Sequence, residues 1–177
     1  MKRLLFTVTL LSMTSPLLAQ SQTFGRESQQ VPPLAKTVSL AGPRFGVTFL
    51  SDQTVAKLKA DADVTVRNSI SQFGWQFERQ FYSKEGGPTV LNEWVFLAGG
   101  LDQGVLLPSL NWLVGLRSRD GAEFGIGPNV TPAGVGLAIA AGMTMRTGVL
   151  NIPINVAVVP SREGVRVSML TGFTLRK

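Results

Sequence analysis

The sequence contains no cysteine and no histidine. Without cysteine the chain has no disulfide bonds to hold it together. Without histidine it lacks the Ser-His-Asp and Cys-His nucleophile arrangements, the histidine-ligated zinc sites and the commonest general base of enzymes. We therefore predict that the protein is not an enzyme and that it holds no metal ion and no cofactor.

Runs of like charge are also missing. The 17 basic and 11 acidic residues give a formal net charge of +6, and the basic residues are scattered singly along the chain. Nucleic-acid-binding proteins gather lysine and arginine in runs or on one face. We therefore expect no nucleic-acid partner.

The N-terminal sequence MKRLLFTVTLLSMTSPLLAQ has the three parts of a secretory signal peptide. Lys2 and Arg3 precede an apolar run, and a Ser-Pro break and the small residue Ala19 follow it. The run is shorter than the roughly 20 apolar residues that a membrane-spanning helix needs. We predict a signal peptide over residues 1–19, cleaved near Ala19. Residues 20–42 are rich in Gln, Ser and Pro, and they predict a flexible periplasmic leader.

Residues 43–177 alternate large apolar side chains with small or polar ones. In the stretch 149–160, Leu150, Ile152 and Ile154 point one way, whereas Asn151 and Asn155 point the other. A period of two is typical of β-strands. Eight such stretches occur, over 44–50, 72–81, 90–98, 110–117, 121–127, 134–146, 149–160 and 165–177.

The connections between these stretches are short and rich in Gly, Pro, Asn, Asp and Ser, which favours antiparallel neighbours. Only the first is long, and there Ser51 or Asp52 can cap a short helix within 51–63. Eight meandering strands leave two open edges unless the sheet closes. We therefore predict an all-β fold, an eight-stranded antiparallel up-and-down transmembrane β-barrel over residues 43–177 with a short helix in the first loop. Pro153 interrupts one strand, and we expect a β-bulge there.

The apolar face of these strands is predicted to face lipid. Its large residues would overfill the interior of an eight-stranded barrel, which has room only for side chains or one small ligand. Charge on a lipid-facing surface costs about 2–4 kcal/mol at mid-bilayer, and nearly all strand charges lie on the opposite face. The predicted lipid-facing aromatic residues are Phe45, Phe49, Phe73, Trp75, Trp112, Phe124 and Phe173.

Two aromatic girdles are expected among these and neighbouring residues. Phe45, Phe81, Phe124 and Phe173 would lie toward one rim of the barrel, and Phe49, Phe73 and Phe96 toward the other.

Charged residues on the small, polar face are predicted to form a structural ion cluster in the lumen. Glu78 and Glu123 could instead be an acid/base pair, but buried charges generally need partners, which favours the structural role. The predicted members of the cluster are Arg44, Glu78, Arg117, Glu123, Arg166 and Arg176.

In these respects residues 43–177 resemble the small eight-stranded outer-membrane β-barrels of the OmpA/OmpX-like class. The resemblance rests on the signal peptide, the strand count, the alternation, the short turns and the C-terminal strand, and it transfers no functional residue. In that class the last strand commonly ends in an aromatic residue, whereas this chain ends in Arg176-Lys177 after Phe173 and Leu175.

The resemblance implies a monomer in the bacterial outer membrane, with both chain ends in the periplasm. It implies a plugged, non-conducting lumen and a structural or interaction role. The expected partners are membrane lipid, with lipopolysaccharide as one candidate, and the outer-membrane assembly machinery.

Two alternatives remain open from the sequence. One is a soluble periplasmic lipocalin-like barrel that binds an apolar ligand, and the other is an envelope enzyme acting on lipid, which the missing histidines disfavour. The direction of the Trp75, Trp112 and Ile152 side chains distinguishes a lipocalin-like barrel from a membrane barrel. They would line the cavity of the first and face lipid in the second.

Overall fold

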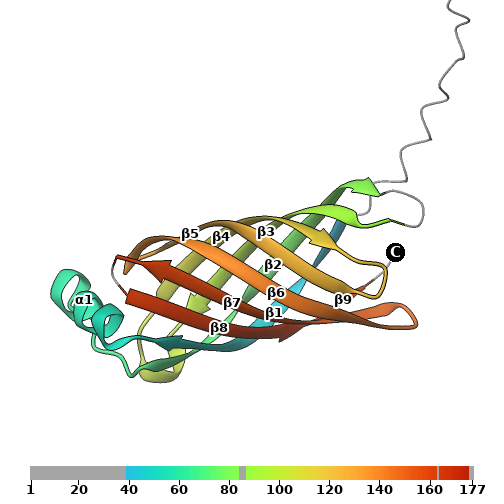
Figure 1. The fold of residues 1–177 in the computed structure, drawn as a ribbon. Coiled ribbons are helices and arrows are strands. Elements are labelled where there is room, and N and C mark those ends of the chain that lie inside the picture. Colours follow the sequence, from blue (N-terminus) through green and yellow to red (C-terminus); the bar gives the residue numbers. More distant parts are fainter. Residues whose placement is uncertain (1–38, 84–86, 163, 176–177) are drawn as a thin grey trace, which may run out of the picture. The chain divides into compact units, whose positions relative to one another are not determined.

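Long antiparallel strands that close on themselves make up the fold in a computed structural model of the chain (Figure 1). The structure describes residues 39–83, 87–162 and 164–175. The elements in chain order are β1 Ser39–Leu50, α1 Asp52–Ala62, β2 Ser69–Ser83, β3 Thr89–Gly99, the short 3-10 helix η1 Leu101–Gln103, β4 Leu107–Arg117, β5 Ala122–Thr131, β6 Gly134–Thr147, β7 Leu150–Ser161, β8 Gly164–Gly172 and β9 Thr174–Leu175.

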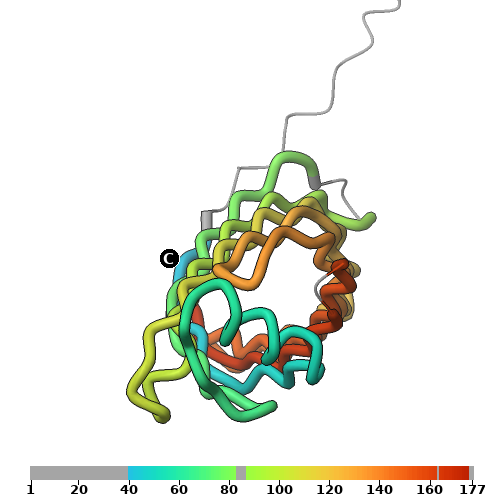
Figure 2. Tube along the Cα trace, turned by 90° about the vertical axis from the view of Figure 1, so that its left-hand side faces the viewer, coloured from blue at the N-terminus to red at the C-terminus, as the bar shows by residue number. Residues whose placement is uncertain are grey.

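Every strand from β1 to β8 pairs antiparallel with its neighbours in the chain, and β8 returns to pair with β1, for example Thr48 opposite Ser168. The ring is therefore closed, and Figure 2 views it nearly along the barrel axis. The two-residue β9 continues β8 and pairs with β7. Among the described residues the barrel thus has eight strands, the last one in two segments, which confirms the predicted fold.

Helix α1 forms in the first loop, as predicted. Ser51 is its N-cap, and its hydroxyl accepts a hydrogen bond from the backbone N–H of Thr54. The helix ends at Ala62, and its C-cap Asp63 adopts a left-handed conformation with φ of 53°. Two residues of the helix, Thr54 and Leu58, are buried, so α1 packs with this side on the barrel mouth.

Strand β1 begins at Ser39 and not at the predicted boundary of Pro43. Leu40 and Gly42 lie opposite Glu78 and Gln76 of the long strand β2. The long strand β2 offers backbone hydrogen-bonding groups to residues 39–42, whatever their side chains are. The β1–β2 pairing therefore extends into the predicted leader. The rest of the leader and the predicted signal peptide lie outside the described residues.

The predicted bulge at Pro153 is wrong. Pro153 lies opposite Thr144 of β6 with no shift of register. On its other side two residue pairs are missing from the ladder between Ile154–Thr171 and Asn151–Thr174, with the register unchanged, and β8 ends there. Proline lacks an N–H, so it removes a ladder bond without adding a residue. A register irregularity does occur in β2, between Gln80 and Tyr82.

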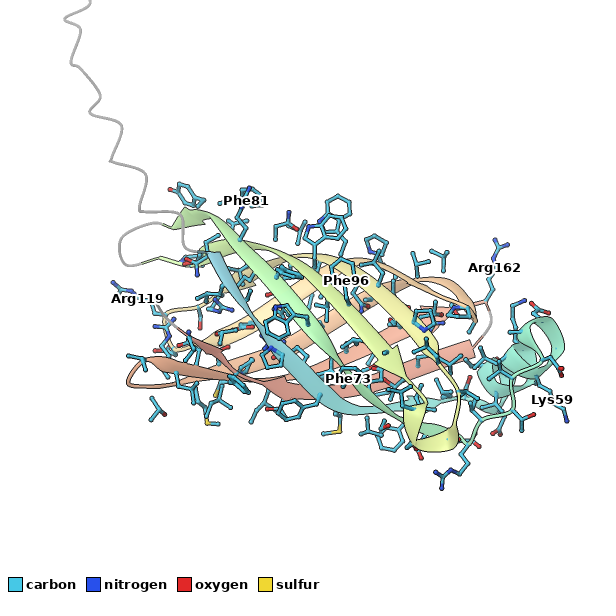
Figure 3. The ribbon with its side chains drawn as sticks, turned by 180° about the vertical axis from the view of Figure 1, so that it is seen from behind. Lys59, Phe73, Phe81, Phe96, Arg119 and Arg162 are labelled. Atoms are coloured by element: carbon cyan, nitrogen blue, oxygen red, sulfur yellow. The ribbon has the colours of Figure 1, made fainter. Side chains whose placement is uncertain are left out.

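The two faces of the barrel are sorted as predicted. Phe73 is 57% exposed on the outer face, whereas Arg44 is 4% exposed in the lumen. Phe73, Phe81 and Phe96 are labelled in Figure 3, which shows side chains projecting from the barrel wall. Large apolar residues therefore lie outside and charged residues inside, which is the reverse of a water-soluble protein.

Candidate functional site in the barrel lumen

An ion cluster fills the lumen toward the end of the barrel opposite α1. Nη1 and Nη2 of Arg117 on β4 donate to the two carboxylate oxygens of Glu78 on β2 at 2.6 and 2.5 Å. Nε of the same guanidinium donates to Glu123 on β5 at 2.5 Å. Strands β2 and β5 lie on either side of the β3–β4 pair, so Arg117 reaches one acidic side chain on each side.

Both carboxylates of this cluster are occupied by protein groups. Thr144 donates its hydroxyl to Glu123, and Gln80 donates its side-chain amide to Glu78. All three charged side chains are less than 10% exposed. A general base needs a free lone pair facing a substrate, so these contacts favour the structural role over an acid/base pair.

Arg44 joins this cluster only at longer range, through electrostatic attraction to Glu78, Glu93 and Glu123, whereas Arg166 lies apart from it. Arg44 donates to Gln76 at 2.8 Å and to the carbonyl of Pro43 at 3.0 Å. Arg166 donates to the Thr131 hydroxyl at 2.6 Å, toward the α1 end. The prediction of a single cluster is wrong for Arg166, because sharing the lumen face says nothing about position along the axis. Arg176 lies outside the described residues.

Glu93 on β3 is a buried acidic side chain that the sequence reasoning missed. It is 6% exposed and lies opposite Glu78 in the β2–β3 register. No described residue forms a hydrogen bond with its carboxylate or an ion pair within 4 Å. The signal was present, because Trp94 and Phe96 on the outer face require Glu93 to point inward.

A small cavity of about 10 Å³ lies among Glu93, Glu123 and Asn155. That volume holds about one water molecule. The Oδ1 atom of Asn155 is buried without a protein hydrogen-bond partner among the described residues. A water molecule in this cavity would satisfy both Glu93 and Asn155.

A larger chamber of about 80 Å³ occupies the lumen between the ion cluster and α1. Its α1 end is apolar and is lined by five members of a buried hydrophobic cluster, namely Leu50, Leu58, Ile70, Leu107 and Ala133. Hydroxyl and amide side chains cover much of its remaining wall, including Thr48, Gln72, Ser109 and Asn129. The lumen is therefore amphipathic.

The loop after β3 is tied to the neighbouring strand by Asp102. Its carboxylate accepts hydrogen bonds from the Ser71 hydroxyl at 2.6 Å and from the Ser71 N–H at 3.1 Å. These donors favour the ionised carboxylate, and the Ser71 hydroxyl is the main cause of the lowered pKa of Asp102. Gln103 adds a bond to the carbonyl of Ser69.

All seven predicted lipid-facing aromatic side chains are exposed on the outer face. The two predicted girdles are wrong, because Phe45 and Phe73, assigned to opposite rims, are direct register partners. Other aromatics gather in a strip across β2, β3 and β4. Within the strip the Trp94 and Trp112 rings stack with centroids 5.5 Å apart, and Trp112 donates to Asn92 at 2.7 Å.

The described residues contain neither a metal-binding cluster nor a membrane-spanning helix. No group of three or more Asp or Glu side chains is placed to hold a metal ion. The helices in this part of the chain are too short or too polar to cross a membrane.

No protein-family profile matches the chain, and no curated protein is similar to it in sequence. The solved structures that match the chain include the crystal structure of Ail, the attachment invasion locus protein of Yersinia pestis, in complex with the heparin analogue sucrose octasulfate. The two chains are 8% identical, with a TM-score of 0.46, and the match covers 77% of this chain and 97% of the Ail chain.

Proposed function

We propose that this protein is an outer-membrane β-barrel with a plugged, non-conducting lumen and a structural or interaction role in the bacterial envelope. The outer face carries the proposal. Trp75 and Trp112 are 45% and 42% exposed there, in company with many other large apolar residues from every strand of the barrel. Soluble monomers rarely expose continuous apolar patches larger than a few hundred Å².

The strand lengths support a bilayer-spanning position. Strands β3 and β4 each have 11 residues and β6 has 14. A tilted transmembrane strand needs roughly 9–11 residues. Closed barrels are one of the two structures that satisfy every backbone group within lipid.

The contents of the lumen support the absence of conduction. The cluster of Arg117, Glu78 and Glu123 fills one end, and α1 places the buried side chain of Leu58 at the other. Eight strands enclose a space that side chains alone can fill. An ion entering from either side would have to displace a protein group.

The predicted signal peptide supports export with cleavage near Ala19. The even strand count supports a position of both ends of the barrel chain on the periplasmic side. The partners in this proposal are membrane lipid, lipopolysaccharide included, and the machinery that inserts such barrels. The protein would act as a monomer and without enzymatic activity.

The outward direction of Trp75 and Trp112 opposes the alternative of a soluble lipocalin-like barrel, whose apolar residues would line its cavity.

The test is fractionation of cells that express the signal-bearing chain, followed by electrophoresis of heated and unheated membrane samples. Recovery in the outer membrane with a band that shifts on heating is the expected result. Recovery as a soluble periplasmic protein without a shift would refute membrane insertion. Planar-bilayer recordings of the purified barrel test the plug separately, and steady single-channel currents would refute it while leaving the membrane location intact.

A further inference from the structure

Two cavities meet at the barrel wall near the α1 end. The inner one is the lumen chamber of about 80 Å³, and the outer one is a groove of about 720 Å³ on the outward side of β2 to β5. Five residues line both of them, namely Leu97, Pro108, Ser109, Thr131 and Pro132. Only a thin part of the wall therefore separates the chamber from the groove.

The backbone ladder is incomplete at this place. Strand β4 pairs with β3 as far as Leu107, opposite Gly99, but it pairs with β5 only from Leu110, opposite Val130. Within the described strands, residues 107–109 thus have no backbone partner in β5. We call this gap beside residues 107–109 the notch, and Asn129 donates to the Ser109 hydroxyl next to it at 3.0 Å.

The chamber side of the notch offers a hydrogen-bond acceptor. Asn129 is 3% exposed, and its Oδ1 atom has no hydrogen-bond partner among the described residues. A buried acceptor that lacks a donor is costly and unusual in folded proteins. The hydroxyls of Ser109 and Thr131 lie in the same part of the wall.

The groove side of the notch is apolar. Aromatic and aliphatic side chains border it, and Ala98 and Pro108 form part of its lining. The groove belongs to the outer face, which the proposed function places in lipid. A hydrocarbon chain would fill it without exposing polar atoms to the membrane.

We propose that the chamber binds the hydroxyl-bearing head of a single-chain lipid while the lipid's hydrocarbon chain lies in the outer groove, the two joined through the notch. The head donates to Oδ1 of Asn129. A water molecule needs about 10–15 Å³ on this scale, so the chamber of about 80 Å³ suits a head of glycerol size. This inference rests on the proposed function, because the lipid whose hydrocarbon chain lies in the groove comes from the membrane around the barrel.

The experiment follows the side-chain amide signal of Asn129 by NMR in the full chain folded in detergent micelles. The probes are monoolein, which has two hydroxyls, and methyl oleate, which has the same chain and no donor. Monoolein is expected to shift the Asn129 signal in a saturable way. Methyl oleate is expected to bind at least about tenfold more weakly, since it leaves the acceptor unsatisfied.

Two matched variants test the groove. Ala98→Trp fills it and is expected to abolish the monoolein shift. Ala141→Trp makes the same change on the outward side of β6, away from the groove, and is expected to leave binding unchanged. Retained binding in Ala98→Trp, or equal affinity for the two probes, would overturn the inference.

Folding is checked in the same samples by the heat-induced gel shift. A shifted band with no monoolein response, or with an Asn129 signal that contacts water alone, overturns the lipid site and leaves the membrane barrel standing. A chain that remains soluble without detergent and shows no shifted band refutes the proposed function instead.

Discussion

Arg117 is the residue whose removal tests the lumen plug most directly. Substitution by leucine would leave Glu78 and Glu123 buried in the lumen without their shared cation. Removal of one partner from a buried ion pair costs about 3–5 kcal/mol, because the remaining charge is neither hydrated nor paired. Arg117→Leu should therefore lower the folding equilibrium constant by roughly a hundred- to several-thousandfold.

The assay is urea unfolding of the barrel in lipid vesicles, followed by the heat-induced gel shift and by tryptophan fluorescence. Arg79→Leu is the matched control, because Arg79 lies on the exposed face of β2 opposite Ser39, the first residue of β1, and so near the end of the barrel, where charge on the outer face costs little. That control should change the free energy of unfolding by less than about 1 kcal/mol.

A rescue variant separates charge from shape. The triple change Arg117→Leu, Glu78→Gln and Glu123→Gln removes every charge of the cluster and should recover most of the lost stability, since neutral replacement of a whole buried pair is often tolerated. A loss of less than about 1 kcal/mol in Arg117→Leu alone would refute the reasoning, because it would mean that water reaches the two carboxylates.

Two further predictions concern the wall and the outer loop. A Cβ at Gly127 would lie 1.9 Å from the carbonyl oxygen of Trp112, whereas the nearest atom to one at Gly125 would be Cβ of Leu113 at 3.6 Å. Gly127→Ala should therefore destabilise the barrel by about 1–3 kcal/mol in urea unfolding, and Gly125→Ala should cost clearly less; equal costs would contradict the close approach. The pKa of Asp102 is lower in the folded protein than its ordinary value of 3.8. The stability that the Asp102 carboxylate contributes is therefore fully present above pH 3.8 and is lost as the pH falls through the lower pKa of the folded state. The protection of the Ser71 amide against hydrogen exchange, relative to an unfolded chain at the same pH, should therefore fall below about pH 3.8 in the wild type but not in Asp102→Asn. A wild-type amide whose protection does not change would contradict this role.

The candidate site was only partly predictable. The alternation of side chains was enough to place Arg117, Glu78 and Glu123 on one face, and the structure brings them into contact. Arg44 shares that face and interacts with the carboxylates at longer range while donating to Gln76, whereas Arg166 lies toward the α1 end and donates to Thr131. Contact between lumen residues depends on strand register, which a single strand does not encode.

The sequence by itself determined the number of strands, the alternation of side chains between the two faces, and a helix in the first loop capped by Ser51 or Asp52. These features depend on a period of two or on a local hydrogen bond, so neighbouring residues suffice to specify them. Only the tertiary structure decided that Phe45 faces Phe73, that Pro153 breaks a ladder without a bulge, and that β4 and β5 part at the notch. These depend on register and on where two strands stop pairing, and both are set jointly by strands whose residues are far apart in the chain.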